Sequence, residues 1–323
     1  MPSPANHNFA RSFLLSVVVL LLATASCRTV ESTSKTSDYI NSAWSSLILG
    51  QPSAVRTDYL LPTNVSLCGE PLPLNRPAVR EKLEFEFLTA VNHKAQVELW
   101  LRRANRYFPL IEAELKRYGL PDDLKYLAVA ESDLRPSVKS HAGAVGLWQF
   151  MPSTARQLGL TVNKEVDLRH LPEPLLRAGL TYLSRLKTKF GSWALAMAAY
   201  NAGDARISRA MSNQGTTDYY ELDLVNETER YVYRIAAIKL VLEGAKSFGF
   251  NENPEPTNWR PLEFDEVNLT FTQPTSWAAL AKAQGCDYKT LRLLNPHLAA
   301  LSPLKGGPFT LRLPKNRNPT LGT

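Results

Sequence analysis

The chain has 323 residues, of which 44% are hydrophobic and 21% are charged, a composition typical of folded globular proteins and unlike that of disordered ones. This length suffices for about two domains with additional terminal segments. The formal net charge of +7 favours an anionic neighbour, such as nucleic acid, a membrane surface or an anionic polymer. The sequence has no dense Lys/Arg run, no aromatic RNA-binding signature and no helix-turn-helix marker, so we expect no nucleic-acid binding.

The N-terminus predicts an exported protein. Arg11 precedes the apolar run SFLLSVVVLLLATASC, which has the length of a signal peptide and is short for a membrane span. Ala23-Thr24-Ala25 fits the cleavage site of a soluble secreted protein. Alternatively, the end of the run resembles a bacterial lipobox, in which Cys27 is the lipidated first residue of the mature chain. We favour lipidation because a Ser/Thr-rich tether follows Cys27, whereas plain secretion and an uncleaved anchor are the alternatives.

The chain has three cysteines and five histidines, which limit the disulfides and metal sites that it can form. If Cys27 carries lipid, Cys68 and Cys286 remain and can pair in an oxidising compartment, and two free thiols are an equal alternative. There is no Cys-x-x-Cys, and the histidines lack metal-ligand spacing. We therefore expect no metal site.

Three regions follow the predicted signal peptide at residues 1–27. Residues 28–66 are rich in Ser, Thr and Asn, which predicts a flexible tether with one short helix at residues 39–49. From Pro77 to about Phe250, apolar residues recur at helical spacing, which predicts a helical domain at residues 67–250. The Asn/Pro-rich segment 251–261 is a predicted linker.

A small module is predicted after the linker. Residues 262–315 have the order strand, helix, helix, strand, and a tail follows at residues 316–323. The predicted fold class is therefore mainly α, with a helical domain and a small β-α-α-β domain.

Prolines, glycines and capping residues mark the predicted helix ends. The segment PLIEAELKRYG predicts a helix that begins at Pro109 and stops at Gly119. Ser192 is a candidate N-cap for a helix that ends at Gly203. Thr228 is a candidate cap for the last helix of the domain.

One glutamate lies on the apolar face of a predicted helix. On the helix that begins at Pro121, the i, i+3, i+4, i+7 spacing of an apolar face connects Leu124 to Glu131. Partial desolvation there raises the pKa of a carboxyl group, and a carboxyl that is protonated near neutral pH can act as a general acid. The alternative is a helix-terminal glutamate that reaches solvent or caps a neighbour.

The following loop has the composition of a sugar-binding segment. Gly143 and Gly146 let the backbone approach a ligand closely. Trp148 and Phe150 offer faces for stacking, and Gln149 offers a hydrogen-bond donor and an acceptor. For each aromatic side chain, packing in the core is the alternative.

Four segments in this order resemble the motifs of the family 1 lytic transglycosylases, namely AESDLRP, GAVGLWQFMPSTA, AAYNAG and ETERYV. The resemblance implies a fold related to goose-type lysozyme. It also implies cleavage of the β-1,4 bond between N-acetylmuramic acid and N-acetylglucosamine in peptidoglycan, with formation of 1,6-anhydromuramic ends. By the same resemblance, Glu131 is the catalytic acid and base, and Tyr231 contacts it. The implied substrate-binding residues are Ser132, Gly146, Leu147, Gln149, Tyr200, Asn201 and Tyr231.

The sequence offers one well-placed carboxylate near this loop. Asp133 points to another side of its helix, and Asp167 and Asp204 fit a loop surface and a helix N-cap. Because most glycosidases use two carboxylates, a single Glu131 suits a reaction assisted by the N-acetyl group of the substrate. We expect no cofactor. The residues around Asp167 and Arg169 depart from the family pattern, which leaves their contacts open.

The C-terminal module resembles a LysM domain in the segments SWAALAKAQGCDYKTLRLLNP and FTLRLP. This resemblance implies binding to glycans that contain N-acetylglucosamine, and a structural appendage is the alternative. The expected partners are peptidoglycan strands and, through the lipid anchor, a membrane of the cell envelope that faces the periplasm. Rival interpretations of the chain are a hydrolytic muramidase on the same fold, a non-catalytic wall-binding scaffold and a binder of membrane surfaces.

Overall fold

The computed structural model describes residues 59–251, 259–299, 303–315 and 317. The predicted signal peptide, the lipidation site at Cys27 and the predicted short helix at residues 39–49 lie outside the described residues. Within the described ranges, no helix is both long enough and apolar enough to cross a membrane.

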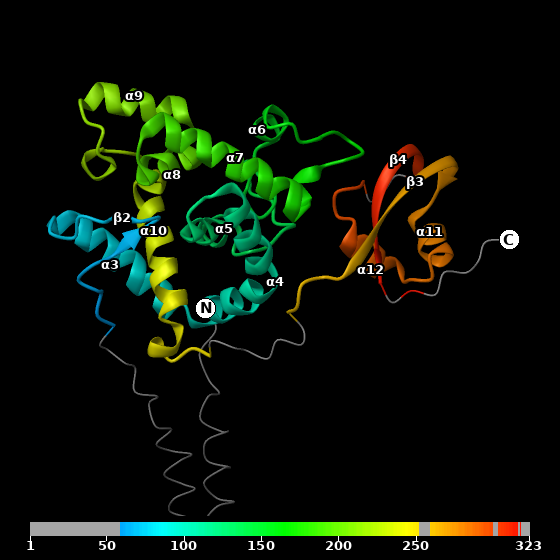
Figure 1. The fold of residues 1–323 in the computed structure, drawn as a ribbon, viewed down its shortest axis with the longest axis horizontal. Helices are drawn as coiled ribbons and strands as arrows, with labels where there is room; N and C mark the ends of the chain where they lie inside the picture. Colours follow the sequence, from blue (N-terminus) through cyan, green and yellow to red (C-terminus); the bar gives the residue numbers. More distant parts are fainter. Residues whose placement is uncertain (1–58, 252–258, 300–302, 316, 318–323) are drawn as a thin grey trace, which may run out of the picture. The chain divides into compact units, whose positions relative to one another are not determined.

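The fold class is confirmed as mainly α, with a helical domain and a small β-α-α-β module (Figure 1). The helical domain contains β1 (Ser66–Leu67), β2 (Glu70–Pro71), α3 (Pro77–Asn92), α4 (Lys94–Tyr118), η1 (Asp122–Leu124), α5 (Lys125–Ser132), α6 (Pro152–Gln157), η2 (Leu168–His170), α7 (Pro172–Phe190), α8 (Trp193–Ala202), α9 (Asp204–Gln214), η3 (Tyr219–Glu221), α10 (Asn226–Glu243) and η4 (Ala245–Phe248).

Helix α10 lies at the centre of the helical domain. It packs against α3, α5 and α8 (Figure 1). Ile235 of α10 and the α3 residues Leu83 and Phe87 are completely buried. Each such side chain contributes about 1.5 to 3 kcal/mol to stability. The packing of α10 against α5 brings Tyr231 of α10 to Glu131 of α5.

Pro109 lies inside a helix, and the prediction that it begins one was wrong. Helix α4 is continuous through this residue. A proline removes one backbone hydrogen bond from a helix interior. The buried face of α4 continues on both sides of the proline, with Val97 before it and Ile111 after it, and this burial offsets the lost bond. Gly119, in the left-handed conformation with φ 65°, ends α4 as predicted.

The two predicted caps have different outcomes. The Ser192 hydroxyl accepts a hydrogen bond from the backbone N–H of Leu195 at 3.1 Å, which confirms it as the N-cap of α8. Thr228 does not cap α10, because that helix begins at Asn226 and buries Thr228 in its first turn. The Thr228 hydroxyl instead donates to Asn201 Oδ1 at 2.9 Å.

The folded part of the domain begins before residue 67, where the predicted tether ends. Leu61 and Val65 are both buried, so the last residues assigned to the tether pack against the domain. Cys68 follows in the turn between β1 and β2. Cys68 and Cys286 are both free cysteines in the structure, so the disulfide that was weighed between them is not formed.

The small module has the predicted order of elements. It consists of β3 (Phe264–Thr275), α11 (Trp277–Ala283), α12 (Tyr288–Leu294) and β4 (Leu304–Pro314). The two strands pair antiparallel. The buried core of the module contains Trp277, Leu280, Ala281, Leu291, Leu298, Leu304, Leu311 and Leu313.

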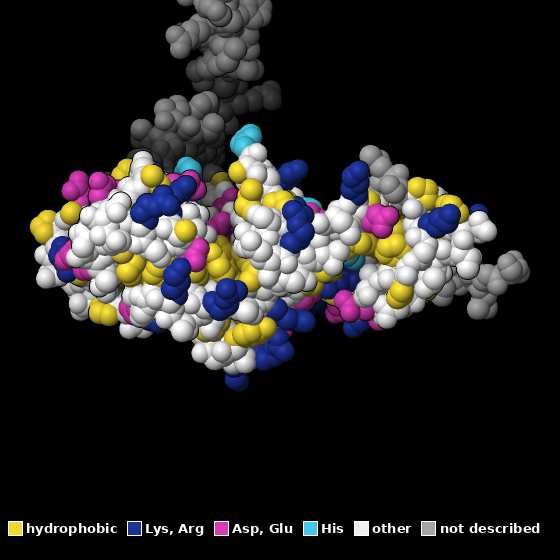
Figure 2. Space-filling model, turned by 90° about the horizontal axis from the view of Figure 1, so that it is seen from above, with side chains coloured by type: hydrophobic (Ala, Val, Ile, Leu, Met, Phe, Trp, Pro, Cys, Tyr) yellow, Lys and Arg dark blue, Asp and Glu magenta, His cyan; other side chains and the backbone are white. Residues whose placement is uncertain are grey.

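Charged side chains are dispersed over the surface drawn in Figure 2. On this face, the Lys and Arg side chains of the described residues lie scattered among acidic, apolar and uncharged groups. Such interspersed charges are typical of a solvated surface.

Replacing Pro109 by Ala is expected to raise the free energy of unfolding by about 1 to 3 kcal/mol, because Ala restores a backbone N–H inside α4. Pro172→Ala is the matched control, since Pro172 is the first residue of α7, where no intrahelical donor is needed. Denaturant unfolding of both variants measures the difference. A Pro109→Ala protein no more stable than the unmodified chain would contradict this interpretation of α4.

Candidate active site

Glu131 lies in the last turn of α5, on the face that the spacing predicted. Leu124, Leu127 and Ala128 of this face are completely buried, whereas Glu131 is half-buried. Glu131 lines a cavity of about 570 Å³. The lining side chains that matter for chemistry are Gln149, Phe150, Tyr200, Asn201, Glu227 and Tyr231.

The surroundings of Glu131 favour its protonated form. Burial raises the pKa of Glu131 from 4.5 to about 7, because desolvation disfavours the charged carboxylate. The Tyr231 hydroxyl donates a hydrogen bond to Glu131 Oε1 and lowers the pKa. The charge of Glu227 raises the pKa, and the guanidinium of Arg234 lowers it. Burial dominates, so the carboxyl group exchanges its proton near neutral pH.

The hydroxyl groups of Tyr231 and Tyr200 each donate one hydrogen bond in the site. Tyr231 is only 2% exposed, and burial raises its pKa well above the ordinary value. The Tyr200 hydroxyl donates to the carbonyl oxygen of Trp148 at 2.6 Å, and burial raises the pKa of this tyrosine as well. Both phenols are therefore neutral donors. Tyr231 donates to the carboxyl group of Glu131, and Tyr200 donates to the backbone of the neighbouring loop.

The Gly143–Phe150 loop forms part of the cavity wall. Gly146 has φ 90°, and a Cβ atom at this position would lie 2.1 Å from the carbonyl oxygen of Arg169, so only glycine fits. Gln149 adopts φ 47°, and its Nε2 donates to Gly146 O at 2.8 Å and to Val138 O at 3.2 Å. The amide oxygen is the group that Gln149 can present to a ligand.

Three predicted substrate-binding residues have buried positions in the loop or beside it. The buried Ser132 hydroxyl donates to the carbonyl oxygens of Leu147 at 2.9 Å and Ala128 at 3.1 Å. The Leu147 side chain is 1% exposed. Ser132, Gly146 and Leu147 are not among the residues that line the cavity. Ser132 thus holds the loop through a backbone carbonyl, whereas Gly146 and Leu147 belong to the buried part of the loop itself.

The two aromatic side chains of the loop differ in their roles. Trp148 is completely buried against Gly179, so its predicted stacking face was wrong and core packing applies. The indole Nε1 of Trp148 has no hydrogen-bond partner among the described residues. Phe150 reaches the cavity and packs against Tyr200 with ring centroids 5.6 Å apart. Although Phe150 is only 3% exposed, both rings border the cavity and form part of its apolar wall.

Asn201 enters the cavity with a fixed orientation. Its Oδ1 accepts the hydrogen bond from Thr228 described above, at 2.9 Å. The amide Nδ2 is therefore the group that Asn201 can direct to a ligand. Together, Gln149 and Asn201 give the cavity one acceptor and one donor near Glu131.

Asp167 and Asp204, the possible second carboxylates, do not line this cavity, and neither does Asp133. Each is held elsewhere: Asp133 accepts from Trp100 Nε1 at 2.9 Å, Asp167 pairs with Arg169 at 2.7 Å, and Asp204 pairs with Lys189 at 2.8 Å. In the parts of the chain that the structure describes, no group of three or more His, Cys, Asp and Glu residues is placed to hold a metal ion.

Glu227 is the second carboxylate of the cavity, and sequence reasoning missed it. It lies exposed in the first turn of α10 and lines the same cavity as Glu131. The signal was present, because Glu227 opens the ETERYV segment that carries Tyr231. Only the packing of α10 against α5 shows that both carboxyl groups face one space.

A family model matches the segment that contains most of this site. Residues 108–222 match the Transglycosylase SLT domain. This range includes Glu131, the Gly143–Phe150 loop, Tyr200 and Asn201. This segment of the helical domain is therefore similar to the Transglycosylase SLT domain.

Two of the similar curated proteins are named lytic murein transglycosylases. The chain is homologous to membrane-bound lytic murein transglycosylase D of Escherichia coli K12, with 30% identity over 218 residues, 66% of this chain and 47% of the relative. It is 28% identical over 181 residues to membrane-bound lytic murein transglycosylase C of Histophilus somni, covering 52% of this chain and 49% of the relative. The chain thus spans about half the length of these curated relatives.

Among solved structures, the chain is similar to the 70 kDa soluble lytic transglycosylase Slt70 of Escherichia coli. The identity is 24% and the TM-score is 0.39, over 54% of this chain and 32% of that chain.

Glu131→Gln is expected to stabilise the protein above about pH 7 by up to about 3 kcal/mol and to leave its stability unchanged near pH 4. Folding raises the pKa of this carboxyl group, so the unfolded chain releases the proton more readily than the folded protein does. The free energy of unfolding therefore decreases as the pH rises from 4.5 to 7. Denaturant unfolding at pH 4 and pH 8 measures this, with Glu227→Gln as the exposed control from the same cavity. Equal effects of Glu131→Gln at both pH values would show that Glu131 is not desolvated.

Proposed function

We propose that this protein is a peptidoglycan lytic transglycosylase that remodels the cell wall. It cleaves the β-1,4 bond between N-acetylmuramic acid and N-acetylglucosamine and leaves 1,6-anhydro-N-acetylmuramic ends. The observation that carries the proposal is the half-buried Glu131, whose pKa of about 7 suits a group that both donates and accepts a proton. The SLT domain match and the names of the relatives support peptidoglycan as the substrate.

In the first step of the proposed reaction, protonated Glu131 donates its proton to the glycosidic oxygen while the bond from that oxygen to the anomeric carbon breaks. The acetamido oxygen of the substrate stabilises the positive charge that develops at the anomeric carbon. Tyr231 donates to Glu131 Oε1 and stabilises the carboxylate that forms.

In the second step, the Glu131 carboxylate takes the proton of the 6-hydroxyl group as its oxygen bonds to the anomeric carbon. This closes the 1,6-anhydro ring and restores the protonated glutamate. No water is consumed, so the atoms and charges balance between one glycan strand and its two products. The same carboxyl group thus serves as acid and then as base.

The other cavity residues bind and orient the sugar in this proposal. The Gln149 amide oxygen and the Asn201 amide nitrogen bond to hydroxyl or acetamido groups, and Phe150 and Tyr200 contact the apolar face of the ring. The backbone of the loop, held by Ser132, sets the positions of Gln149 and Phe150.

A hydrolytic muramidase is the second candidate, and the position of Glu227 favours it. Glycosidases that hydrolyse the bond commonly use two carboxylates on opposite sides of it. Glu227 lines the cavity of Glu131 and could activate a water molecule in place of the 6-hydroxyl group. The product then contains one more water molecule than an anhydro end.

The cell envelope is the proposed location, since the relatives are named membrane-bound. A lipid on Cys27 would hold the chain at a membrane with the catalytic domain in the periplasm. The C-terminal module, with its β-α-α-β order, would bind N-acetylglucosamine-containing strands as a LysM-like domain.

Digestion of purified peptidoglycan tests the reaction, with the products read by mass spectrometry. The unmodified protein is expected to release fragments with anhydro ends, and Glu131→Gln to reduce release by about 100-fold or more, because the proton donor is lost. Fragments heavier by one water, together with an equal loss in Glu227→Gln, would establish the muramidase instead. If the unmodified protein releases no fragments, the proposed activity is contradicted and a non-catalytic wall-binding scaffold is the remaining interpretation.

The rate of digestion is expected to fall as the pH rises through about 7, since deprotonated Glu131 cannot donate to the leaving oxygen. Initial rates between pH 5 and pH 9 at constant ionic strength measure this limb. A rate that is constant or increases across pH 7 would contradict a protonated Glu131 as the acid.

A further inference from the structure

The wall of the cavity formed by the Gly143–Phe150 loop is held through its backbone. Val145 and Phe150 exchange two backbone hydrogen bonds, each of 3.1 Å, which close the loop on itself. Between them Gln149 adopts the left-handed conformation with φ 47°, which is unfavourable for a residue with a side chain. Such a conformation persists only where the surroundings fix it. The position of Gln149 in the cavity therefore depends on contacts at the ends of the loop.

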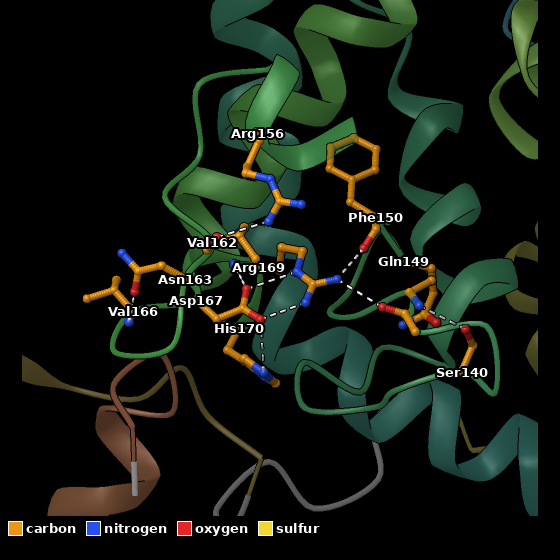
Figure 3. Close-up of polar contacts among 12 residues, drawn as sticks. Ser140, Gln149, Phe150, Arg156, Val162, Asn163, Val166, Asp167, Arg169 and His170 are labelled. Carbon is orange, nitrogen blue, oxygen red and sulfur yellow. Dashed lines mark hydrogen bonds and ion pairs between the residues drawn. The ribbon is translucent and has the colours of Figure 1, made fainter. Parts of the chain in front are cut away.

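Arg169 makes those contacts from a neighbouring segment. Its Nη1 donates to the carbonyl oxygens of Gly143 and Phe150, each at 2.9 Å, and so bridges the two ends of the loop (Figure 3). The Arg169 side chain is only 6% exposed. The bonds to these carbonyls are charge-assisted and shielded from water, which makes them stronger than neutral hydrogen bonds at the surface.

Asp167 orients this guanidinium. Its two carboxylate oxygens accept from Arg169 Nε at 2.9 Å and Nη2 at 2.7 Å, in the bidentate arrangement visible in Figure 3. Burial opposes ionisation of Asp167, but the hydrogen bonds and charge of Arg169 outweigh it and hold the pKa below its usual range. Asp167 is thus charged at neutral pH. Because Asp167 binds Nε and Nη2 of the guanidinium, the remaining nitrogen, Nη1, faces the loop.

The backbone of Arg169 also touches the loop. Its carbonyl oxygen occupies the space where a Cβ atom on Gly146 would lie, 2.1 Å away. The glycine of the loop and the arginine of the η2 segment therefore fit each other. Replacing Gly146 by any residue with a Cβ atom would therefore shift the loop backbone beneath Gln149.

We infer that Arg169 is a positioning residue of the catalytic site, which bridges the Gly143 and Phe150 carbonyls and thereby sets the place of Gln149 beside Glu131. The inference rests on the proposed function for its effect on rate, because Arg169 is not among the residues that line the cavity and acts through the loop. A misplaced binding group lowers the rate by up to about 100-fold, although the acid itself is unchanged.

Arg169→Lys tests this role, because lysine keeps the charge and loses the planar fork that reaches Asp167 and both carbonyls together. Arg156→Lys is the matched control, since exposed Arg156 donates by Nη1 to a single loop carbonyl, that of Val162, at 3.0 Å. Peptidoglycan digestion and amide hydrogen exchange are measured below the melting temperature of each variant. Asp167→Asn, which keeps the bridging guanidinium, is the second variant.

We expect Arg169→Lys to lose about 10- to 100-fold in the digestion rate, with the pH midpoint near 7 retained and the Val145 and Phe150 amides exchanging faster. Arg156→Lys is expected to change neither property. The digestion rate of Asp167→Asn is expected to decrease less than that of Arg169→Lys. If Arg169→Lys does not fold, the amide hydrogen exchange of Asp167→Asn provides the test.

Unchanged exchange and unchanged digestion in Arg169→Lys would overturn the inference. In Asp167→Asn, a loss as large as that of Glu131→Gln or a moved pH midpoint would also contradict it, because a general structural role would then be the explanation. An unmodified protein without activity would refute the proposed function, and the exchange rates would still decide whether Arg169 holds the loop.

Discussion

A carboxyl group at the end of an apolar helix face loses hydration, and its charged form then depends on a few fixed donors. Glu131 is in this position because α5 packs against α10 in the core of the helical domain. Tyr231, from α10, provides the donor, and burial outweighs it, which leaves the pKa at about 7. The packing that stabilises the fold thus also sets the proton affinity on which the proposed reaction depends.

The loop beside Glu131 shows how the backbone can form a binding wall. Its carbonyl groups accept hydrogen bonds from Ser132, Tyr200 and Arg169, each from a different segment of the chain. These donors leave Gln149 and Phe150 directed to the cavity. The residues around Glu131 therefore fall into two groups. One group lines the cavity, and the other holds the lining residues in place.

Helix faces, which follow a periodic pattern in the sequence, were predicted correctly. Contacts of individual residues were not. The face that connects Leu124 of η1 to Glu131 of α5 was predictable because apolar residues recur from one helical turn to the next. Pro109 was misread because the burial of α4 on both sides outweighs one proline. Trp148 was misread because the composition of a loop does not tell which side chain turns inward.

Two residues of the site owe their place to tertiary packing. Glu227 lies close to Tyr231 in sequence, but only the packing of α10 against α5 brings it to the cavity of Glu131. Arg169 contacts carbonyl groups 19 and 26 residues away, and backbone acceptors leave no pattern in the sequence. Such contacts follow from the tertiary fold and need the structure.

The most direct test of the account is the titration of the Glu131 carboxyl itself. Nuclear magnetic resonance of protein labelled with ¹³C in the glutamate side chains follows the Cδ shift with pH, and Glu131→Gln identifies the signal. The account predicts a midpoint of about 7. A midpoint near 4.5, the ordinary value for a glutamate, would show that the carboxyl is hydrated and already ionised, and would contradict its role as the acid.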